Sequence, residues 1–366
     1  MVLFGGMLLL ASVVMAAPSI QAPADPAAAL GRRALAFLAG RAADPDPEVR
    51  AAVAAAWGEI GNPAAKPLLE KAAADRNDYV RIEAAASLEL LGARGAHVLE
   101  EIVSKSSATT GAHLSPAEEM RVLAHDKARV AAIRKLAGMG SERVVALLEK
   151  TLEDRSPSVR DATAVALCRL GFDEFSSRFL EALSDPDESV RSAAAKALGE
   201  IALPAAAEPL MRIAGEDSAD VRAEVMRSLG ALEDDIVVDT LVKGVQDDKA
   251  RVRLMAAGGL ARHASSSAAM PMLRRLAKDE KTPDLALKAM EGLARRGETV
   301  GLSLAERTLS GPDIDGRMIA LDVIAAVRTD AALELLKGAM ERDASPRVRV
   351  QAAALIVKRL QKGGAQ

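Results

Sequence analysis

The chain has 366 residues, of which 50% are apolar and only 2% aromatic, and its formal net charge is −3. Its core must therefore be built from Ala, Leu, Val and Ile, and because Ala and Leu are the best helix formers the composition predicts an all-α protein. The 48 basic residues are scattered among 51 acidic ones. Such a mixture produces no global field that would attract nucleic acid or an anionic membrane, so we expect no nucleic-acid partner.

The N-terminus differs in character from the rest of the chain. Residues 2–17 are apolar and uncharged, and residues 18–30 are rich in Pro and Ala. This pattern predicts a signal peptide over 1–17, cleaved before Ala17, then a linker over 18–30. No Lys or Arg precedes the apolar run, so an uncleaved anchor remains an alternative, although the run is shorter than the roughly 20 residues of a membrane span. We expect a periplasmic or secreted protein without a membrane span after cleavage.

A short pattern recurs along the remaining sequence. It consists of Asp, a Val-Arg pair five and six positions later, and an Ala-rich run that ends near Leu-Gly. From Val159 onward, adjacent copies lie 31 residues apart, and a fixed period of this length is the signature of a repeat array whose neighbours share one continuous core. The clear copies contain Val49-Arg50, Val80-Arg81, Val159-Arg160, Val190-Arg191, Val221-Arg222, Val252-Arg253 and Val348-Arg349.

The copy over residues 185–214 predicts the structure of one repeat. Apolar residues recur at spacings of three and four from Val190 to Ile201, which indicates an amphipathic first helix with Asp185 as its N-cap. A second helix begins near Pro204. Since only a few residues separate the two helices, they must form an antiparallel hairpin.

Two of these copies, Asp185–Ile201 and Asp44–Gly61, resemble the HEAT-like repeats named for phycobilin lyase subunits. The resemblance implies an all-α α-solenoid, a superhelix of about ten stacked antiparallel hairpins, over residues 31–362. It implies an interaction scaffold more often than an enzyme. The polar stretch at 104–116 breaks the period and predicts an exposed loop, which is either a tolerated insertion or a contact element.

Asp and Arg recur at a constant offset of six residues. A row of charges at equivalent positions is compatible with a binding ladder. The stronger interpretation is a structural ladder, in which an Asp that caps one helix faces an Arg of the same or the next repeat. Recurrence in every regular copy favours the structural interpretation. The pairs are Asp44/Arg50, Asp75/Arg81, Asp154/Arg160, Asp185/Arg191, Asp247/Arg253 and Asp343/Arg349.

Motifs for catalysis are absent from the sequence. The single cysteine, Cys168, takes the place that Gly199 and Gly230 hold in later repeats, which predicts a small core residue. No phosphate-binding or dinucleotide-binding glycine motif occurs, and no two histidines have the spacing of metal ligands. We therefore predict a protein that is not an enzyme, with no catalytic residue, metal or cofactor. The histidines are His97, His113, His125 and His263.

The expected function is a non-catalytic scaffold or adaptor that binds a protein partner on the solenoid surface. The alternative is a lyase-like or chaperone-like accessory protein that acts on a bound protein, and a third possibility is a purely structural spacer. We expect the second helices of the hairpins to line the concave side, where a mixed-charge surface would suit a protein partner. The candidate partner-binding residues on these helices are Lys71, Glu208, Arg212, Asp239, Lys243, Arg274 and Arg275.

Overall fold

The computed structural model of the chain describes residues 26–105, 114–279, 281–298 and 300–363. Over these residues the chain forms helices, turns and loops and no strand, which confirms the predicted all-α class. In chain order, a first helix that carries the Val-Arg position alternates with a second helix. Nine such repeats run from α3–α4 to α19–α20 within these ranges.

The first helices have 11 to 21 residues each. They are α3 Pro47–Ile60, α5 Asp78–Leu90, α7 Pro116–Leu136, α9 Pro157–Arg169, α11 Glu188–Ile201, α13 Ala219–Leu229, α15 Ala250–Arg262, α17 Pro283–Arg295, α19 Ile314–Ala326 and α21 Pro346–Gly363.

The second helices are shorter in most repeats, and in four repeats a single 3-10 turn precedes them. They are α2 Pro26–Arg41, α4 Lys66–Ala72, α6 Ala96–Ser104, α8 Glu142–Thr151, α10 Ser177–Ala182, α12 Ala207–Ile213, α14 Val238–Gly244, α16 Ala269–Leu276, α18 Ser303–Leu309 and α20 Asp330–Arg342. The 3-10 turns are η1 Pro63–Ala65, η2 Asp173–Phe175, η3 Pro204–Ala206 and η4 Asp235–Val237.

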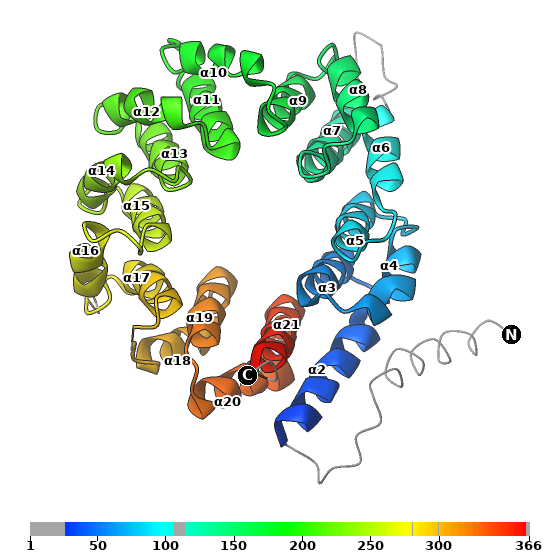
Figure 1. Cartoon of the computed structure of the whole chain (residues 1–366), viewed down its shortest axis with the longest axis vertical. Helices are drawn as coiled ribbons and strands as arrows, with labels where there is room; N and C mark the ends of the chain where they lie inside the picture. The colour runs from blue at the N-terminus through cyan, green and yellow to red at the C-terminus, as the bar shows by residue number, and fades with distance from the viewer. Residues whose placement is uncertain (1–25, 106–113, 280, 299, 364–366) are drawn as a thin grey trace, which may run out of the picture. The chain divides into compact units, whose positions relative to one another are not determined.

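The chain divides into two compact units. Unit 1 comprises Met1–Leu147 and Thr329–Gln366, and unit 2 comprises Leu148–Arg328. In unit 2 the first helices α11, α13, α15 and α17 stack side by side on the inner side of an arc, and the second helices lie outside them (Figure 1). The expectation that second helices line the concave side is therefore wrong for this unit. The concave side belongs to the first helices, because their small residues let them approach more closely.

The close approach of first helices is visible at their glycines. A Cβ on Gly230 would lie 2.4 Å from the Cα of Gly259, and one on Gly199 would lie 2.7 Å from the Cα of Ser228. Only a residue without a Cβ fits such contacts without displacing the neighbouring backbone. Cys168, at the equivalent position of α9, is buried, so the prediction of a small core residue there is confirmed.

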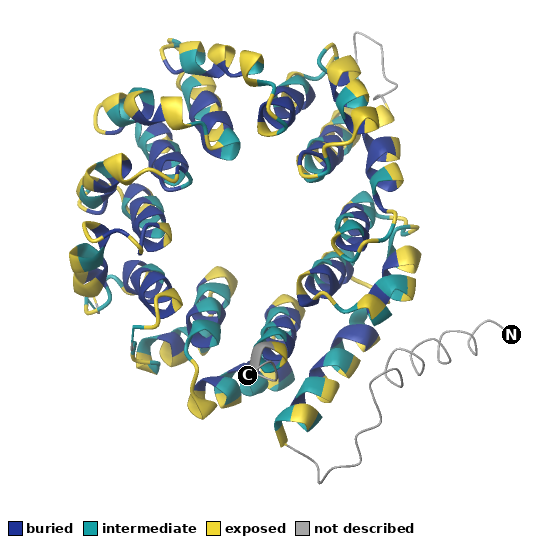
Figure 2. Cartoon of the chain, in the orientation of Figure 1, coloured by how far each residue is buried: buried dark blue, intermediate teal, exposed yellow. Residues whose placement is uncertain are grey.

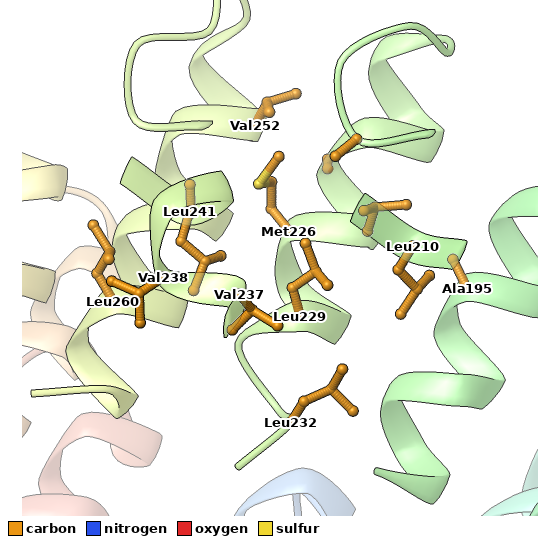
Figure 3. Close-up of a cluster of buried hydrophobic side chains, with 14 of the residues drawn as sticks. Ala195, Leu210, Met226, Leu229, Leu232, Val237, Val238, Leu241, Val252 and Leu260 are labelled. Atoms are coloured by element: carbon orange, nitrogen blue, oxygen red, sulfur yellow. The ribbon is translucent and has the colours of Figure 1, made fainter. Parts of the chain in front are cut away.

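The core of unit 2 fills the space between its two layers of helices. Leu210, Leu241 and Leu260 are fully buried and project from neighbouring repeats into one continuous cluster (Figure 3). The first helices carry most of the buried residues, whereas the second helices are largely exposed on their outer faces (Figure 2). Because adjacent repeats share this cluster, each hairpin depends on its neighbours for burial of its apolar face.

Unit 1 contains a repeat that is split between the two ends of the chain. The C-terminal helix α21 packs against α20 on one side and against α2 and α3 on the other. Helix α2 leads into α3 through the same kind of turn by which α4 leads into α5, so it holds the place of a second helix whose first helix is α21. This split pair supplies the tenth repeat.

Several contacts join the two halves of the split repeat. Leu38 is completely buried on α2, and a Cβ on Gly31 would lie 3.3 Å from Leu360 Cδ1 of α21. The guanidinium of Arg349 lies 4.9 Å from the centre of the Phe37 ring, close enough for a cation–π contact. The Lys358 ammonium also joins α21 to the next first helix, α3, through an ion pair with Glu59 at 3.0 Å. The chain ends are thus tied together by packing as well as by charge.

The structure corrects three details of the predicted repeats. The N-cap of α11 is Asp187, not Asp185, and the Asp185 carboxylate instead accepts a hydrogen bond from the backbone N–H of Asp187 at 2.8 Å. The Val190 side chain is 37% exposed, although the equivalent Val221 is fully buried. Residues 26–30, assigned to the linker, belong to helix α2.

Two predicted segments fall partly or wholly beyond the described ranges. The signal peptide over 1–17 lies outside the described residues. For the predicted loop at 104–116, α6 ends at Ser104 and α7 begins at Pro116, while residues 106–113 lie outside the described residues. Within the described part of the chain, no helix is both long and apolar enough to cross a bilayer.

Candidate protein-binding surface

The recurring Asp and Arg residues form a ladder between repeats. In three rungs the guanidinium Nε and Nη2 donate to both carboxylate oxygens of an Asp in the following repeat, at 2.6–2.9 Å. The same guanidinium donates through Nη1 to a backbone carbonyl oxygen of its own repeat, at 2.7–2.8 Å. The three rungs are Arg50–Asp75, Arg191–Asp217 and Arg222–Asp247.

The arginines of the ladder hold the pKa values of their aspartate partners below the ordinary value. The hydrogen bonds from Arg222 lower the pKa of Asp247 to about 2, and those from Arg50 and Arg191 lower the pKa values of Asp75 and Asp217. These carboxylates are mostly buried and already occupied. The structural interpretation of the ladder is confirmed at these three rungs, and in them the charges are not available to a partner.

All seven residues predicted to bind a partner are exposed on second helices. Arg274 is already engaged by the carboxylate of Glu298, which raises the arginine pKa. In unit 2, these helices form the convex side, so six of the seven residues do not share the concave surface for which we chose them. The structure does not gather the seven into one site. They are Lys71 on α4, Glu208 and Arg212 on α12, Asp239 and Lys243 on α14, and Arg274 and Arg275 on α16.

The first helices of unit 1 carry a groove that sequence reasoning missed. It has a volume of about 680 Å³ and crosses three neighbouring helices, α21, α3 and α5. Its floor is formed by Ala51, Ala52 and Ala55 of α3, whose small side chains leave room above the helix backbone. Tyr79 of α5 stands at one side and is 45% exposed.

Tyr79 holds a position that is polar in the other clear copies of the repeat. The residue just before the Val of the repeated Val-Arg pair is Glu48 in α3, Asp220 in α13 and Arg347 in α21, whereas α5 has Tyr79 at the equivalent position before Val80. An outward-facing polar site is thus occupied by the only tyrosine of the chain. Exposed Tyr is enriched among residues that carry binding energy in protein interfaces. A comparison of the repeat copies in the sequence could therefore have identified Tyr79 as a candidate binding residue.

Charged residues border the alanine floor on both sides. Arg347 lies 3.9 Å from Glu48, and Lys135 of α7 holds the Glu83 carboxylate at 2.9 Å. Both pairs are solvent-exposed or partly so, and exposed pairs of this kind are worth only about 0–1 kcal/mol each. The groove therefore combines an apolar floor, one aromatic side chain and a rim of weakly held charges, as protein interfaces do.

Outside the groove, the part of the chain that the structure describes holds one buried thiol and no cluster of metal-binding side chains. Burial raises the pKa of the Cys168 thiol to about 11, so this thiol is protonated and a poor nucleophile at neutral pH. Among the described residues, no group of three His, Cys, Asp or Glu side chains is placed to hold a metal ion.

Comparison with known proteins identifies repeats of one kind along much of the chain. The family of HEAT repeats matches residues 14–89, 147–230 and 176–257, and the PBS lyase HEAT-like repeat matches residues 128–154. No curated protein matches the sequence. Together these ranges cover more than half of the chain, in both units.

Solved structures with similar helices include proteins of different kinds. The complex of CpcE and CpcF of phycocyanin lyase from Nostoc sp. matches with 21% identity and a TM-score of 0.36, over 63% of this chain and 95% of that chain. Human deoxyhypusine hydroxylase matches with 19% identity and a TM-score of 0.32, over 79% and 97%. An engineered protein matches with 18% identity and a TM-score of 0.31, over 89% and 98%.

Proposed function

The chain belongs to the HEAT-repeat family, and from this membership we propose that it is a non-catalytic scaffold that binds a protein partner in the groove over α21, α3 and α5. The single observation that carries the proposal is Tyr79, an exposed aromatic side chain beside an alanine floor in a chain with almost no aromatic residues. Repeat proteins use continuous surfaces of this kind to hold extended or helical segments.

The groove favours a partner segment with an apolar side and flanking charges. Its alanine floor admits close approach of a backbone or a helix, and the Tyr79 ring offers a rigid contact that loses little conformational entropy on binding. Arg347 and Glu48, at the position that Tyr79 takes in α5, present one charge of each sign at the edge. A mixed-charge edge sets orientation more than affinity.

The test begins with the full chain, tagged at its C-terminus and crosslinked in its native host. A partner recovered in constant proportion is then purified, and its affinity for the chain is measured by calorimetry. We expect Tyr79→Ala to weaken binding at least about tenfold, since loss of an interface anchor costs about 2 kcal/mol or more. Tyr79→Phe should retain most of the affinity.

Leu90→Ala is the matched control. Leu90 lies on the same helix, is 71% exposed and does not line the groove, so its removal should change affinity less than twofold. Equal affinities for wild type and Tyr79→Ala would remove the groove as the binding surface. Equal losses for Tyr79→Ala and Leu90→Ala would indicate a general effect on α5 instead of a contact.

A lyase-like or chaperone-like accessory role is the second candidate. The match of residues 128–154 to the PBS lyase HEAT-like repeat favours it, and it requires the same bound protein plus a change in that protein. Mass spectrometry of the recovered partner would test it. A covalent change that appears only with the intact chain would support it, whereas an unchanged partner mass and unchanged partner folding would leave the scaffold role alone.

We further propose that the protein works outside the cytoplasm, in the periplasm or as a secreted protein. The support is the uncharged apolar run of residues 2–17, followed by the Pro/Ala-rich stretch. N-terminal sequencing of the protein from separated cell fractions tests this proposal. A mature N-terminus at Ala17 in the periplasmic or secreted fraction is expected, and an intact N-terminus in the cytoplasm would refute it.

A further inference from the structure

Among the residues that the structure describes, two rungs of the ladder in unit 2 lack the pair between arginine and carboxylate, at Arg160–Asp185 and at Arg253–Asp279, and the second of them lines a pocket. Arg253 holds the position of Arg222 in the following repeat, and Asp279 holds that of Asp247. Arg253 Nη1 donates to the backbone oxygens of Asp247 at 2.8 Å and Asp248 at 3.0 Å, as Arg50 and Arg191 do in their closed rungs. Its Nε and Nη2, which hold a carboxylate at Arg222, have no acceptor among the described residues.

At the Arg253 rung, donors other than the arginine hold the carboxylate of Asp279. Asp279 Oδ1 accepts from the backbone N–H of Lys281 at 3.1 Å, and Asp279 Oδ2 accepts from the Thr282 hydroxyl at 3.1 Å. In the closed rungs, the carboxylate oxygen equivalent to Oδ2 accepts from an arginine Nε. The residue three positions after the aspartate is Asp78 or Ala250 there, and neither side chain offers a hydroxyl.

A pocket of about 210 Å³ fills the place of the missing pair. Arg253 and Arg275 line it with two guanidinium groups against the single carboxylate of Asp279. Met272, Leu276 and Leu285 contribute an apolar wall. The pocket therefore holds an arginine whose side chain is preset for a carboxylate, a second cation and an apolar surface, all from unit 2.

We propose that this pocket binds a carboxylate group carried on a short aliphatic stem. The Nε and Nη2 of Arg253 would hold it as Arg191 holds Asp217, because Nη1 of both arginines donates to the carbonyl oxygens six and five residues earlier in the chain. The stem would lie against Met272 and Leu285, and Arg275 would add a second positive charge. The volume admits about seven water-sized groups at about 30 Å³ each, which fits one amino-acid residue.

Two sources provide this chemistry, a free small carboxylic acid and the C-terminal carboxylate of a polypeptide. The probes are 4-methylpentanoate, the peptide acetyl-Gly-Gly-Leu with a free carboxyl group, and the same peptide as its C-terminal amide. Binding to the full chain is measured by calorimetry and by ligand-observed NMR. We expect saturable binding of at least one carboxylate probe and none of the amide.

Variants of the rung identify the site. Arg253→Gln should weaken binding at least about tenfold, since a bidentate charge-assisted pair is lost. Thr282→Val removes the hydroxyl donor of Asp279 Oδ2, so this oxygen can compete with the ligand for Arg253 and binding should also weaken. Arg251→Gln is the control: Arg251 lies two residues away, and its pair with Asp220 is exposed, so its binding should equal that of wild type. Circular dichroism checks that each variant remains folded.

Each outcome decides the proposal. Binding of the free acid alone identifies a small-molecule carboxylate site, and binding of the free peptide but not its amide identifies a site for a chain terminus. Absence of binding by both carboxylate probes, or equal binding by wild type and Arg253→Gln, would overturn the proposal. The groove of the proposed scaffold function lies in unit 1, so Tyr79→Ala should leave this binding unchanged and the two proposals can fail separately.

Discussion

The two units build the same stack from differently ordered pieces of chain. Unit 2 is one uninterrupted segment, in which every first helix packs on the next one along the sequence. Unit 1 combines the start and the end of the chain, and residues 148–328 lie between its two parts. Neighbouring hairpins therefore pack in the same way whether or not they are adjacent in sequence. The entropic cost of folding differs, because distant segments must be brought together before their contacts form.

Removal of α2 should break the comparison most strongly. A chain that begins after Arg41 lacks the second helix of the split repeat, including the buried Leu30 and Leu38. Exposure of the α21 face should destabilise unit 1 by on the order of 5 kcal/mol. Hydrogen exchange should show loss of protection in α21 and α3 but not in α13. A chain that begins at Pro26 is the control. Equal protection of α21 in both chains would show that α2 does not stabilise α21.

A single buried leucine in each unit tests the same difference more finely. Leu38 of unit 1 and Leu210 of unit 2 are both fully buried, and replacement by Ala should cost about 2–5 kcal/mol in either case. Leu38→Ala should lower exchange protection in α21, whereas Leu210→Ala should lower it in α11 and α13. Urea unfolding gives the free energies. Loss of protection in both units from either variant would mean that they unfold as one.

Acid should weaken the ladder in both units. The folded-state pKa of Asp247 is about 2, below the ordinary value of 3.8, so its stabilising effect is full above about pH 4 and is lost as the pH falls toward 2. Asp247→Asn should cost about 1.5–3 kcal/mol near neutral pH and flatten this part of the pH dependence of the unfolding free energy. Asp75→Asn should do the same in unit 1. If the unfolding free energy of Asp247→Asn fell with acid as steeply as that of the wild type, the acid dependence could not be assigned to Asp247.

The smallest predicted effect separates two serines that face equivalent glycines. The Ser87 hydroxyl of unit 1 donates to the carbonyl oxygen of Ala54 at 2.8 Å. The Ser228 hydroxyl of unit 2 is buried and lacks a hydrogen-bond partner among the described residues. Ser87→Ala should therefore cost about 1 kcal/mol, while Ser228→Ala should be neutral or stabilising. Thermal unfolding compares them, and equal costs would show that the hydroxyl groups act through packing alone.

The repeat fold could be predicted from the sequence because its signals are local. The apolar spacing within one copy and the Val-Arg period define the helices and their number, and the small residue at Gly199 defines the close contact. The ladder was also accessible, because a charged pair repeated at fixed offset implies a shared structural role. These predictions depend only on residues within about one repeat of each other.

The missed features depend on comparisons across repeats or across the whole chain. The N-cap shifts from Asp185 to Asp187 because both carboxylates can accept backbone N–H groups, and only geometry decides which one begins the helix. The convex position of Arg212 follows from how tightly first helices pack. The groove at Tyr79 includes Arg347 from the opposite end of the chain, and no local pattern brings these two residues together.

The split repeat also constrains the order in which the protein can mature. Ribosomes make α2 before α21, so the face of α2 that packs against α21 lacks this partner until α21 has been made. Unit 2 can complete its stack during synthesis, because each first helix packs against the first helix of the repeat made just before it. Unit 1 can complete its stack only after α21 has been made. Until then, the face of α2 that α21 covers remains accessible to chaperones or transport machinery.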